Sequence, residues 1–248
     1  MEKKRIWGCS SFFLHILAMV LMLSDHLWAT LFPAQEWMTC IGRMAFPIFA
    51  FMIVEGYFHT ADFRKYMKRM LLFALLSEIP FDLIYGSTWF YPFHQNVLWT
   101  FLLALCLIRL CEKARTARTK WLYWVRIPLV CMAGYLLGTI TMVDYFGAGV
   151  LMVLVFYFFR GKQWWCFLGQ LLCLGILNLH TLAGYFYTVS LGSFTISVAQ
   201  QGFALLALLP IWLYDGRQGY HSKGFQYLCY GFYPLHLLLL YGIWNMVS

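Results

Sequence analysis

The sequence SSFFLHILAMVLMLSDHLWATLFP, residues 10–33, is an apolar run that carries an aspartate and a histidine side by side, Asp25 and His26. A helix of about 20 mostly apolar residues is long enough to cross the hydrocarbon core of a bilayer. A basic head precedes the run, but the run is too long for a signal peptide and lacks an A-x-A-like cleavage site. We therefore expect an uncleaved first membrane span with two ionisable side chains inside it.

The composition of the whole chain has the same membrane character. Of 248 residues, 62% are hydrophobic and only 11% are charged, and the mean hydropathy is +0.69. Aromatic residues reach 20%, which fits many membrane–water boundaries where Trp and Tyr anchor a helix. The formal net charge of +8 is explained by basic cytoplasmic loops, so we expect a lipid bilayer and no nucleic acid as partner. The eight cysteines contain no C-x-x-C pair and are interpreted as packing residues.

Similar apolar segments recur along the chain and predict an all-α integral membrane protein with a single domain over residues 1–248. We expect a polytopic bundle of about nine transmembrane helices. The alternative adds a tenth element, short or re-entrant, at 181–193. The nine expected spans cover residues 10–32, 43–59, 66–85, 95–112, 122–140, 145–159, 163–180, 194–214 and 226–246.

The basic residues indicate how these spans are oriented. Seventeen of the 18 lysines and arginines lie before the first span or around the links that follow even-numbered spans. Because lysine and arginine are retained in cytoplasmic loops, the N-terminus is expected in the cytoplasm and the C-terminus outside. The remaining basic residue, Arg43, begins the second span at the outer side, where a lone positive charge needs a partner or a task.

Several polar residues fall inside or next to the expected spans. Each ionisable one costs about 2.5–3.5 kcal/mol or more at the bilayer centre, so such residues are functional candidates. The outer-half candidates are Asp25, His26, Arg43, Glu78, Asp82, His94, Gln95 and Asn96. The candidates near the inner face are Glu55, His59 and Arg64 with the basic residues that follow it. His236 falls near the middle of the ninth span.

Structural roles are open at both faces. Asp25 and Arg43 could form a salt bridge between the first two helices, and Glu55 could simply pair with the basic residues at 64–65. His26 is the strongest functional candidate, because the ordinary pKa of histidine suits proton transfer near neutral pH. Adjacent residues on a helix point about 100° apart, so Asp25 is not expected to bond the ring of its neighbour.

The other polar residues have structural interpretations as well. Glu78 and Asp82 lie four residues apart, share a helix face and could bind backbone groups. His94 could be a solvated loop histidine. His236 could bond a carbonyl freed by the proline that precedes it in the same helix.

The chain resembles the TraX family in a series of segments. These are MLSDHLWATLFP (22–33), IGRMAFPIFAFMIVEGYFHT (41–60), RKYMKRMLLFALLSEIPFDL (64–83), QNVLWTFLLAL (95–105), YFGAGVLMVLVFYFFR (145–160) and YLCYGFYPLHLLLLY (227–241). The family is grouped with transmembrane acyltransferases, and its namesake N-acetylates the pilin subunit of a conjugative plasmid. The resemblance implies acetyl transfer from cytoplasmic acetyl-CoA, as co-substrate, to an acceptor outside the cell membrane. The acceptor could be a protein N-terminus, a glycan or a small amine.

The resemblance and the residue chemistry together give each position a role. His26 is expected to be the general base, with direct attack on the thioester or a transient acyl-histidine as the two routes. A cation or an amide donor would stabilise the oxyanion. The catalytic candidates are Asp25, His26, Arg43 and Asn96. The acceptor-binding candidates are Glu78, Asp82, His94, Gln95 and His236. The acetyl-CoA-binding candidates are Glu55, His59, Arg64, Lys65, Lys68 and Arg69. No metal motif such as H-E-x-x-H occurs, so no metal is expected.

Two other classes of function are compatible with this sequence. A proton- or ion-coupled transporter would relay charge through Asp25, His26, Glu78 and Asp82, although no inverted repeat stands out. A non-catalytic assembly scaffold would leave the intramembrane charges unexplained. We therefore expect an acetyltransferase that is a multi-pass protein of a bacterial inner or plasma membrane.

Overall fold

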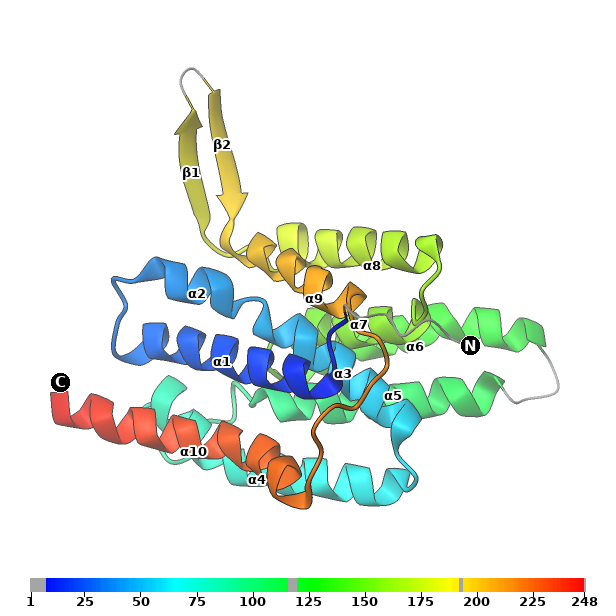
Figure 1. The fold of residues 1–248 in the computed structure, drawn as a ribbon, viewed down its shortest axis with the longest axis horizontal. Helices are drawn as coiled ribbons and strands as arrows, with labels where there is room; N and C mark the ends of the chain where they lie inside the picture. The colour runs from blue at the N-terminus through cyan, green and yellow to red at the C-terminus, as the bar shows by residue number, and fades with distance from the viewer. Residues whose placement is uncertain (1–7, 116–119, 192–193, 248) are drawn as a thin grey trace. The chain divides into compact units, whose positions relative to one another are not determined.

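A computed structural model describes residues 8–115, 120–191 and 194–247, and most of them are helical (Figure 1). The elements, in chain order, are α1 (Ser11–Thr30), α2 (Glu36–Gly42), α3 (Ala45–His59), α4 (Phe63–Tyr85), α5 (Val97–Arg115), α6 (Lys120–Ile140), α7 (Phe146–Phe158), α8 (Trp164–Ile176), the π-helical turn η1 (Leu177–Thr181), β1 (Phe186–Leu191), β2 (Phe194–Ala199), the 3₁₀-helix η2 (Gln200–Ala207), α9 (Leu208–Trp212) and α10 (Lys223–Val247).

Within the described residues, three helical stretches are long and apolar enough to cross a membrane: Ser11–Thr30, Glu36–His59 and Trp164–Thr181. Shorter apolar helices cover Val125–Ile140, Phe146–Phe158 and Gln200–Trp212. The expected helical class and membrane character are thus confirmed, whereas nine spanning helices stay a prediction.

The chain after α8 differs from the expected helices at 181–193 and 194–214. Residues 186–199 contain an antiparallel hairpin in which Phe186 lies opposite Ala199 and Leu191 lies opposite Phe194. The hairpin points away from α8 and α9 in Figure 1, and only Gln200–Trp212 of the expected span is helical. The reason is local, because these strands are rich in aromatic and β-branched residues, which favour an extended backbone. Mean hydropathy does not detect that preference.

The expected second span over 43–59 is also changed, since two helices replace it. Helix α2 begins at Glu36 and ends at Gly42, and α3 resumes at Ala45. Pro47 lies in the first turn of α3, where its missing N–H is one of the donors that a helix leaves unpaired. Arg43 therefore lies at a break between two helices rather than at the start of one.

The described residues divide into two compact units, and the chain passes between them within α3, after Arg160 and within α10. The first unit contains residues 8–52 and 161–232, and the second contains 53–160 and 233–247. The largest fully buried side chains of the first unit include Leu14, Ile48, Leu174 and Leu208. Those of the second include Met70, Leu105, Ile108, Met152, Leu154 and Phe156.

Side-chain caps fix where several helices begin. Ser10 accepts a hydrogen bond from the Phe13 N–H at the start of α1, and Asp62 accepts one from the Lys65 N–H at the start of α4. Asn96 accepts from the Leu98 N–H, 3.0 Å away, at the start of α5. Such caps each contribute about 1 kcal/mol, and the last one fixes a residue that the sequence marked as functional.

Candidate functional site

Asp25 in α1 meets the break between α2 and α3 within the first unit. The Arg43 Nη2 lies 3.1 Å from the Asp25 Oδ1, so the expected salt bridge between the first two helical segments is confirmed. Thr39 of α2 donates its hydroxyl proton to the same Oδ1, 2.7 Å away. The Thr39 hydroxyl also accepts from the Arg43 Nε at 3.2 Å and Nη2 at 2.8 Å. The Thr39 hydroxyl therefore bridges the Asp25 carboxylate and the Arg43 guanidinium.

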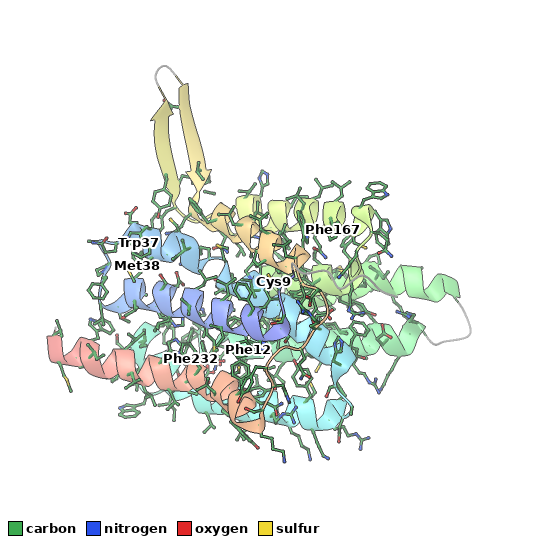
Figure 2. The ribbon with its side chains drawn as sticks, in the orientation of Figure 1. Cys9, Phe12, Trp37, Met38, Phe167 and Phe232 are labelled. Atoms are coloured by element: carbon green, nitrogen blue, oxygen red, sulfur yellow. The ribbon has the colours of Figure 1, made fainter. Side chains whose placement is uncertain are left out.

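The close approach of α1 and α2 is possible because position 42 has no side chain. A Cβ built on Gly42 would lie 2.5 Å from the Asp25 Cβ, which no packed core tolerates. Farther along, the Ser24 hydroxyl donates to the Met38 carbonyl over 3.1 Å, and Figure 2 shows Met38 beside Trp37 on α2. These contacts hold the acid, the threonine and the arginine in one arrangement. We call Asp25, Thr39 and Arg43 the polar triad; Thr39 is buried, and the side chains of Asp25 and Arg43 are each 19% exposed.

His26 follows the triad residue Asp25 in α1. Its backbone carbonyl accepts from the Thr30 hydroxyl at 2.7 Å, and its ring interacts electrostatically with Arg43. Of the outer-half candidates, Asp25, His26 and Arg43 belong to the first unit, whereas Asp82, His94 and the other residues belong to the second.

Glu78 of α4 and Asn96 at the start of α5 form a polar group in the second unit. Glu78 accepts from the Trp99 indole N–H at 2.8 Å and from the Asn96 amide. Asn96 is fully buried and also donates to the Ala74 carbonyl over 2.9 Å. Both amide protons of Asn96 are therefore in use, and its donation to an oxyanion would require one of these bonds to break.

Asp82 and Gln95 organise the loop that carries His94. The Asp82 Oδ2 accepts from the Tyr91 N–H at 2.8 Å, and the Gln95 amide donates to the Pro92 carbonyl at 2.9 Å. Their side chains thus bind backbone within this loop, as the structural interpretation of Asp82 expected. His236 is buried in α10, with its ring 5.8 Å from that of Tyr233.

His94 has an acidic partner that the sequence analysis did not identify. Its Nε2 lies 3.4 Å from the Oδ1 of Asp144, which is in the link between α6 and α7. This side-chain interaction raises the pKa of His94 above its ordinary 6.5; burial opposes the shift, and the charges of Asp144, Glu78 and Asp82 add to it. His94 is thus no freely solvated loop histidine.

Three polar atoms near this group are buried without a hydrogen-bond partner in the described part of the chain. They are the Ser77 Oγ, the Glu78 Oε1 and the Asp82 Oδ1, all from α4. Most buried polar atoms in proteins are paired, so these oxygens are available acceptors for a proton or for a donor on a substrate.

The inner-face candidates are arranged differently from the expected pairing. Glu55 pairs with Arg160, with 2.6 Å between Oε1 and Nε and 3.3 Å between Oε2 and Nη2. The guanidinium carbon of Arg160 also lies 4.2 Å from the centre of the Phe58 ring. The His59 Nδ1 donates to the Glu55 carbonyl over 2.8 Å. The predicted partner at 64–65 is wrong, because the end of α7 supplies a closer cation, 105 residues away in sequence.

The first turns of α4 hold the remaining acetyl-CoA-binding candidates. Arg64, Lys65 and Lys68 are exposed, and the Nζ of Lys65 lies 3.6 Å from Asp62. Arg69 is half-buried, and its Nε has no hydrogen-bond partner among the described residues. Exposed cations together with a buried unpaired guanidinium N–H form an arrangement that can bind phosphate.

A cavity of about 440 Å³ lies beside the start of α1 in the first unit and was not anticipated from the sequence. It is lined by Gly8, Cys9, Ser10, Phe13, Arg217 and Gly219. The Ser11 N–H donates to the Arg217 carbonyl and the Phe12 N–H to the Gln218 carbonyl, so backbone bonds join the two segments that line it. The only cation of the lining, Arg217, is paired with Asp215, which lowers the pKa of that carboxyl. No group of three or more potential metal ligands lies together in the described residues.

Comparison with known proteins gives one family and several relatives. A model of the TraX protein family matches residues 10–244. The chain is 28% identical over 247 residues to the "Probable fimbrial assembly protein FimC, serogroup H1" of Dichelobacter nodosus, and the match covers 93% of this chain and 94% of that protein. It is 31% identical over 142 residues to a "Protein TraX" of Escherichia coli, a match over 57% of this chain but only 52% of that protein. No solved structure matches.

Proposed function

Because the chain belongs to the TraX family, we propose that it is a membrane-embedded acetyltransferase. It moves an acetyl group from acetyl-CoA at the cytoplasmic face to an amine or hydroxyl acceptor at the outer face of the cell membrane. The nine-pass topology with a cytoplasmic N-terminus is part of this proposal. The observation that carries it is the polar triad of Asp25, Thr39 and Arg43 beside His26, in two helical stretches that are apolar enough to span the bilayer.

The triad suits acyl transfer because it fixes a positive charge in an apolar setting. Attack on a thioester places negative charge on the carbonyl oxygen, and a preorganised donor stabilises that charge best where water is excluded. Arg43 is held on one side by Asp25 and Thr39, so part of its fork of N–H donors is oriented before substrate binds. We assign Arg43 to the oxyanion. A histidine takes the acceptor's proton, and the sequence favours His26 for that step.

The cytoplasmic end of the proposed path is basic. Arg64, Lys65, Lys68 and Arg69 follow one another along the first turns of α4, and coenzyme A carries several phosphate charges that such cations bind. Glu55 and His59 lie at the end of α3, where Glu55 is already neutralised by Arg160. We therefore assign phosphate binding to the four basic residues and a supporting role to Glu55 and His59.

The relatives give the first acceptor to test. One of them is named as a probable fimbrial assembly protein, so a fimbrial or pilus subunit is the acceptor we would offer before glycans or small amines. The choice among these acceptors does not alter the proposed chemistry of acetyl transfer, which is the same for each acceptor.

The test is turnover of acetyl-CoA by the purified protein in lipid nanodiscs. We expect the protein to release the coenzyme A thiol faster than empty nanodiscs do. Arg43→Gln should abolish this release while the Tm shows that the variant remains folded. Arg115→Gln is the matched control, since this exposed arginine pairs only loosely with Glu112, 3.4 Å away. Turnover by Arg43→Gln at the rate of the unmodified protein would refute the assignment of Arg43.

A second function is favoured by one observation, the buried unpartnered oxygens of Glu78 and Asp82. Carboxylates of this kind are typical of proton relays. A proton- or ion-coupled transporter would acidify or alkalinise the interior of proteoliposomes on a substrate gradient without consuming acetyl-CoA. A proton or ion flux of that kind without release of the coenzyme A thiol would favour the transporter over the acetyltransferase.

A further inference from the structure

His94 and Asp144 form a histidine–carboxylate pair that no role described so far uses. The two residues are far apart in sequence, and backbone hydrogen bonds bring their segments together. The Gln95 N–H donates to the Met142 carbonyl and the Asp144 N–H donates to the Gln95 carbonyl, each over 2.9 Å. These two bonds tie the loop before α5 to the link before α7 within the second unit.

Asp144 is held through its backbone and through one of its carboxylate oxygens. Its backbone carbonyl accepts from the Thr100 hydroxyl at 2.7 Å, and its Oδ1 accepts from the Tyr145 N–H at 3.1 Å. Gly149 permits this packing, since a Cβ there would lie 3.0 Å from the Asp144 carbonyl oxygen. Tyr145 itself has φ of 60°, a left-handed conformation that is uncommon for residues other than glycine. A strained backbone next to a fixed carboxylate is a common arrangement at functional sites.

The ring of His94 is fixed as well, and its side chain stays partly exposed. Phe81 lies edge-on to the ring at 5.0 Å, and Phe146 lies nearly parallel at 6.4 Å. Because Nε2 faces Asp144, the preferred neutral tautomer carries its proton on Nε2 and has the lone pair on Nδ1. No hydrogen bond to Nδ1 occurs among the described residues. The side chain is 32% exposed, so a substrate can reach it.

From this geometry we propose that His94 is the general base that deprotonates the acceptor and that Asp144 is its positioning residue. The proposal rests on the acetyl transfer alone, and within the second unit it assigns to His94 the base role that the sequence favoured for His26. A base oriented through its second nitrogen by a carboxylate is the arrangement on which histidine catalysis commonly depends. The 3.4 Å separation is long for a hydrogen bond, but such contacts often tighten only when substrate is bound.

The proton and electron balance of the step is simple. The lone pair of the acceptor nitrogen or oxygen attacks the acetyl carbonyl carbon, and the acceptor's N–H or O–H proton passes to Nδ1 of His94. The carbon–sulfur bond then breaks, its electron pair leaves with the coenzyme A sulfur, and the thiolate takes a proton from water. His94 returns its proton to the outer medium. The products are acetylated acceptor and coenzyme A, and nothing is oxidised or reduced.

The charges around His94 predict the pH at which it works. Asp144 faces the ring from the link before α7, Glu78 and Asp82 act on it from α4, and Tyr233 of α10 interacts with Asp144 and Glu78. The pKa of His94 is raised above 6.5, and a protonated ring cannot accept a proton. The rate should therefore rise with pH through that raised pKa and level off above it.

The experiment measures hydrolysis of acetyl-CoA, with water as the acceptor, across a pH series in lipid nanodiscs. His94→Gln should lower the rate by about 10²- to 10⁴-fold and abolish the rising limb. Asp144→Asn should shift the limb to lower pH, because the charge that raises the His94 pKa is gone, and Asp144→Glu should move it part of the way back. A merely structural aspartate would lower the rate without moving the limb. His221→Gln, at an exposed loop histidine, is the matched control and should leave the profile unchanged.

Several results would overturn the proposal. A rising limb retained in His94→Gln but lost in His26→Gln would return the base to His26. Where a variant is inactive, titration of the His94 ring by NMR in nanodiscs gives the pKa without turnover, and equal values in the unmodified protein and in Asp144→Asn would refute the positioning role. No hydrolysis or transfer at all by the unmodified protein would remove the proposed function and the base with it, whereas normal turnover by His94→Gln removes only the base.

Discussion

Replacement of Thr39 by valine tests the polar triad most directly, because valine keeps the shape of threonine and removes only the hydroxyl. In the native structure that hydroxyl donates to Asp25 at 2.7 Å and accepts from two nitrogens of Arg43 at 3.2 and 2.8 Å. Thr39 is fully buried, so water does not replace the lost bonds. Asp25 and Arg43 both lose their hydrogen bonds to Thr39, whereas the 3.1 Å contact between Asp25 and Arg43 stays.

The magnitude follows from the number and kind of the lost bonds. A hydrogen bond to a charged group contributes about 1.5–3 kcal/mol, whereas polar bonds inside membrane proteins average about 0.6 and reach about 1.7 kcal/mol. The three bonds share one oxygen and are not additive, so we expect a total of about 1.5–3 kcal/mol for the substitution. If the loss falls on the orientation of Arg43 in the transition state, it lowers the rate about 10- to 100-fold.

The assay is steady-state release of coenzyme A in nanodiscs, with the Tm measured in parallel. Thr39→Val should lower kcat and leave the KM for acetyl-CoA almost unchanged, because Arg43 is assigned to the transition state rather than to binding. Thr39→Ser keeps the hydroxyl and should restore most of the rate. Thr139→Val removes another helix threonine hydroxyl, one that donates to the Tyr135 carbonyl over 2.8 Å, and should have no effect on kcat. Equal kcat values for Thr39→Val and the unmodified protein would refute the role of the triad.

Three further changes test the packing, the inner ion pair and the co-substrate. Gly42→Ala places a Cβ 2.5 Å from that of Asp25 and should lower the stability by about 1–3 kcal/mol, seen as a lower Tm. The control Gly175→Ala, whose new Cβ meets nothing within 4 Å, should leave the Tm unchanged. A Tm of Gly42→Ala equal to that of the unmodified protein would contradict the close approach. Arg160→Gln leaves Glu55 without its main counter-charge. The loss of stability should be smaller than the about 3–5 kcal/mol of a fully buried pair, because Arg160 is 38% exposed. The double variant with Glu55→Gln should regain part of the lost stability, and an unchanged Tm of the single variant would disprove the pairing. Coenzyme A should raise the Tm saturably, with a stabilisation of about 2.7 kcal/mol at 100 times its Kd. A variant with glutamine at Arg64, Lys65 and Lys68 should need more coenzyme A for the same Tm shift. No Tm shift at millimolar coenzyme A would count against a transferase.

The contacts that the sequence predicted are those between residues already marked by an unusual position. Asp25 and Arg43 are charges in the outer half of neighbouring apolar segments, so their pairing follows from orientation alone. Thr39 was missed because the second span was placed at 43–59, which left this residue in a presumed loop. Its signal was present, since the apolar helical stretch that α2 and α3 form together begins at Glu36.

Other contacts depend on distance in three dimensions, which a single sequence does not contain. Asp144 looks like any acid between two apolar runs until the backbone bonds of Gln95 with Met142 and Asp144 join its link to the loop of His94. The partner of Glu55 came from 105 residues away rather than from its own link. The hairpin was missed for another reason, because its aromatic and β-branched residues raise the hydropathy of a window as helix residues do.

The arrangement of α1 and α2 has a consequence for how the chain enters the bilayer. Asp25 and Arg43 lie on one helical hairpin, separated only by the end of α1, the turn at 31–35 and α2. An aspartate alone near the centre of a translocating helix costs about 2.5–3.5 kcal/mol, but its counter-ion follows within the same inserting pair of segments. The two charges can therefore be neutralised while the ribosome is still extending the chain, and the first two segments need no later helix to become membrane-compatible.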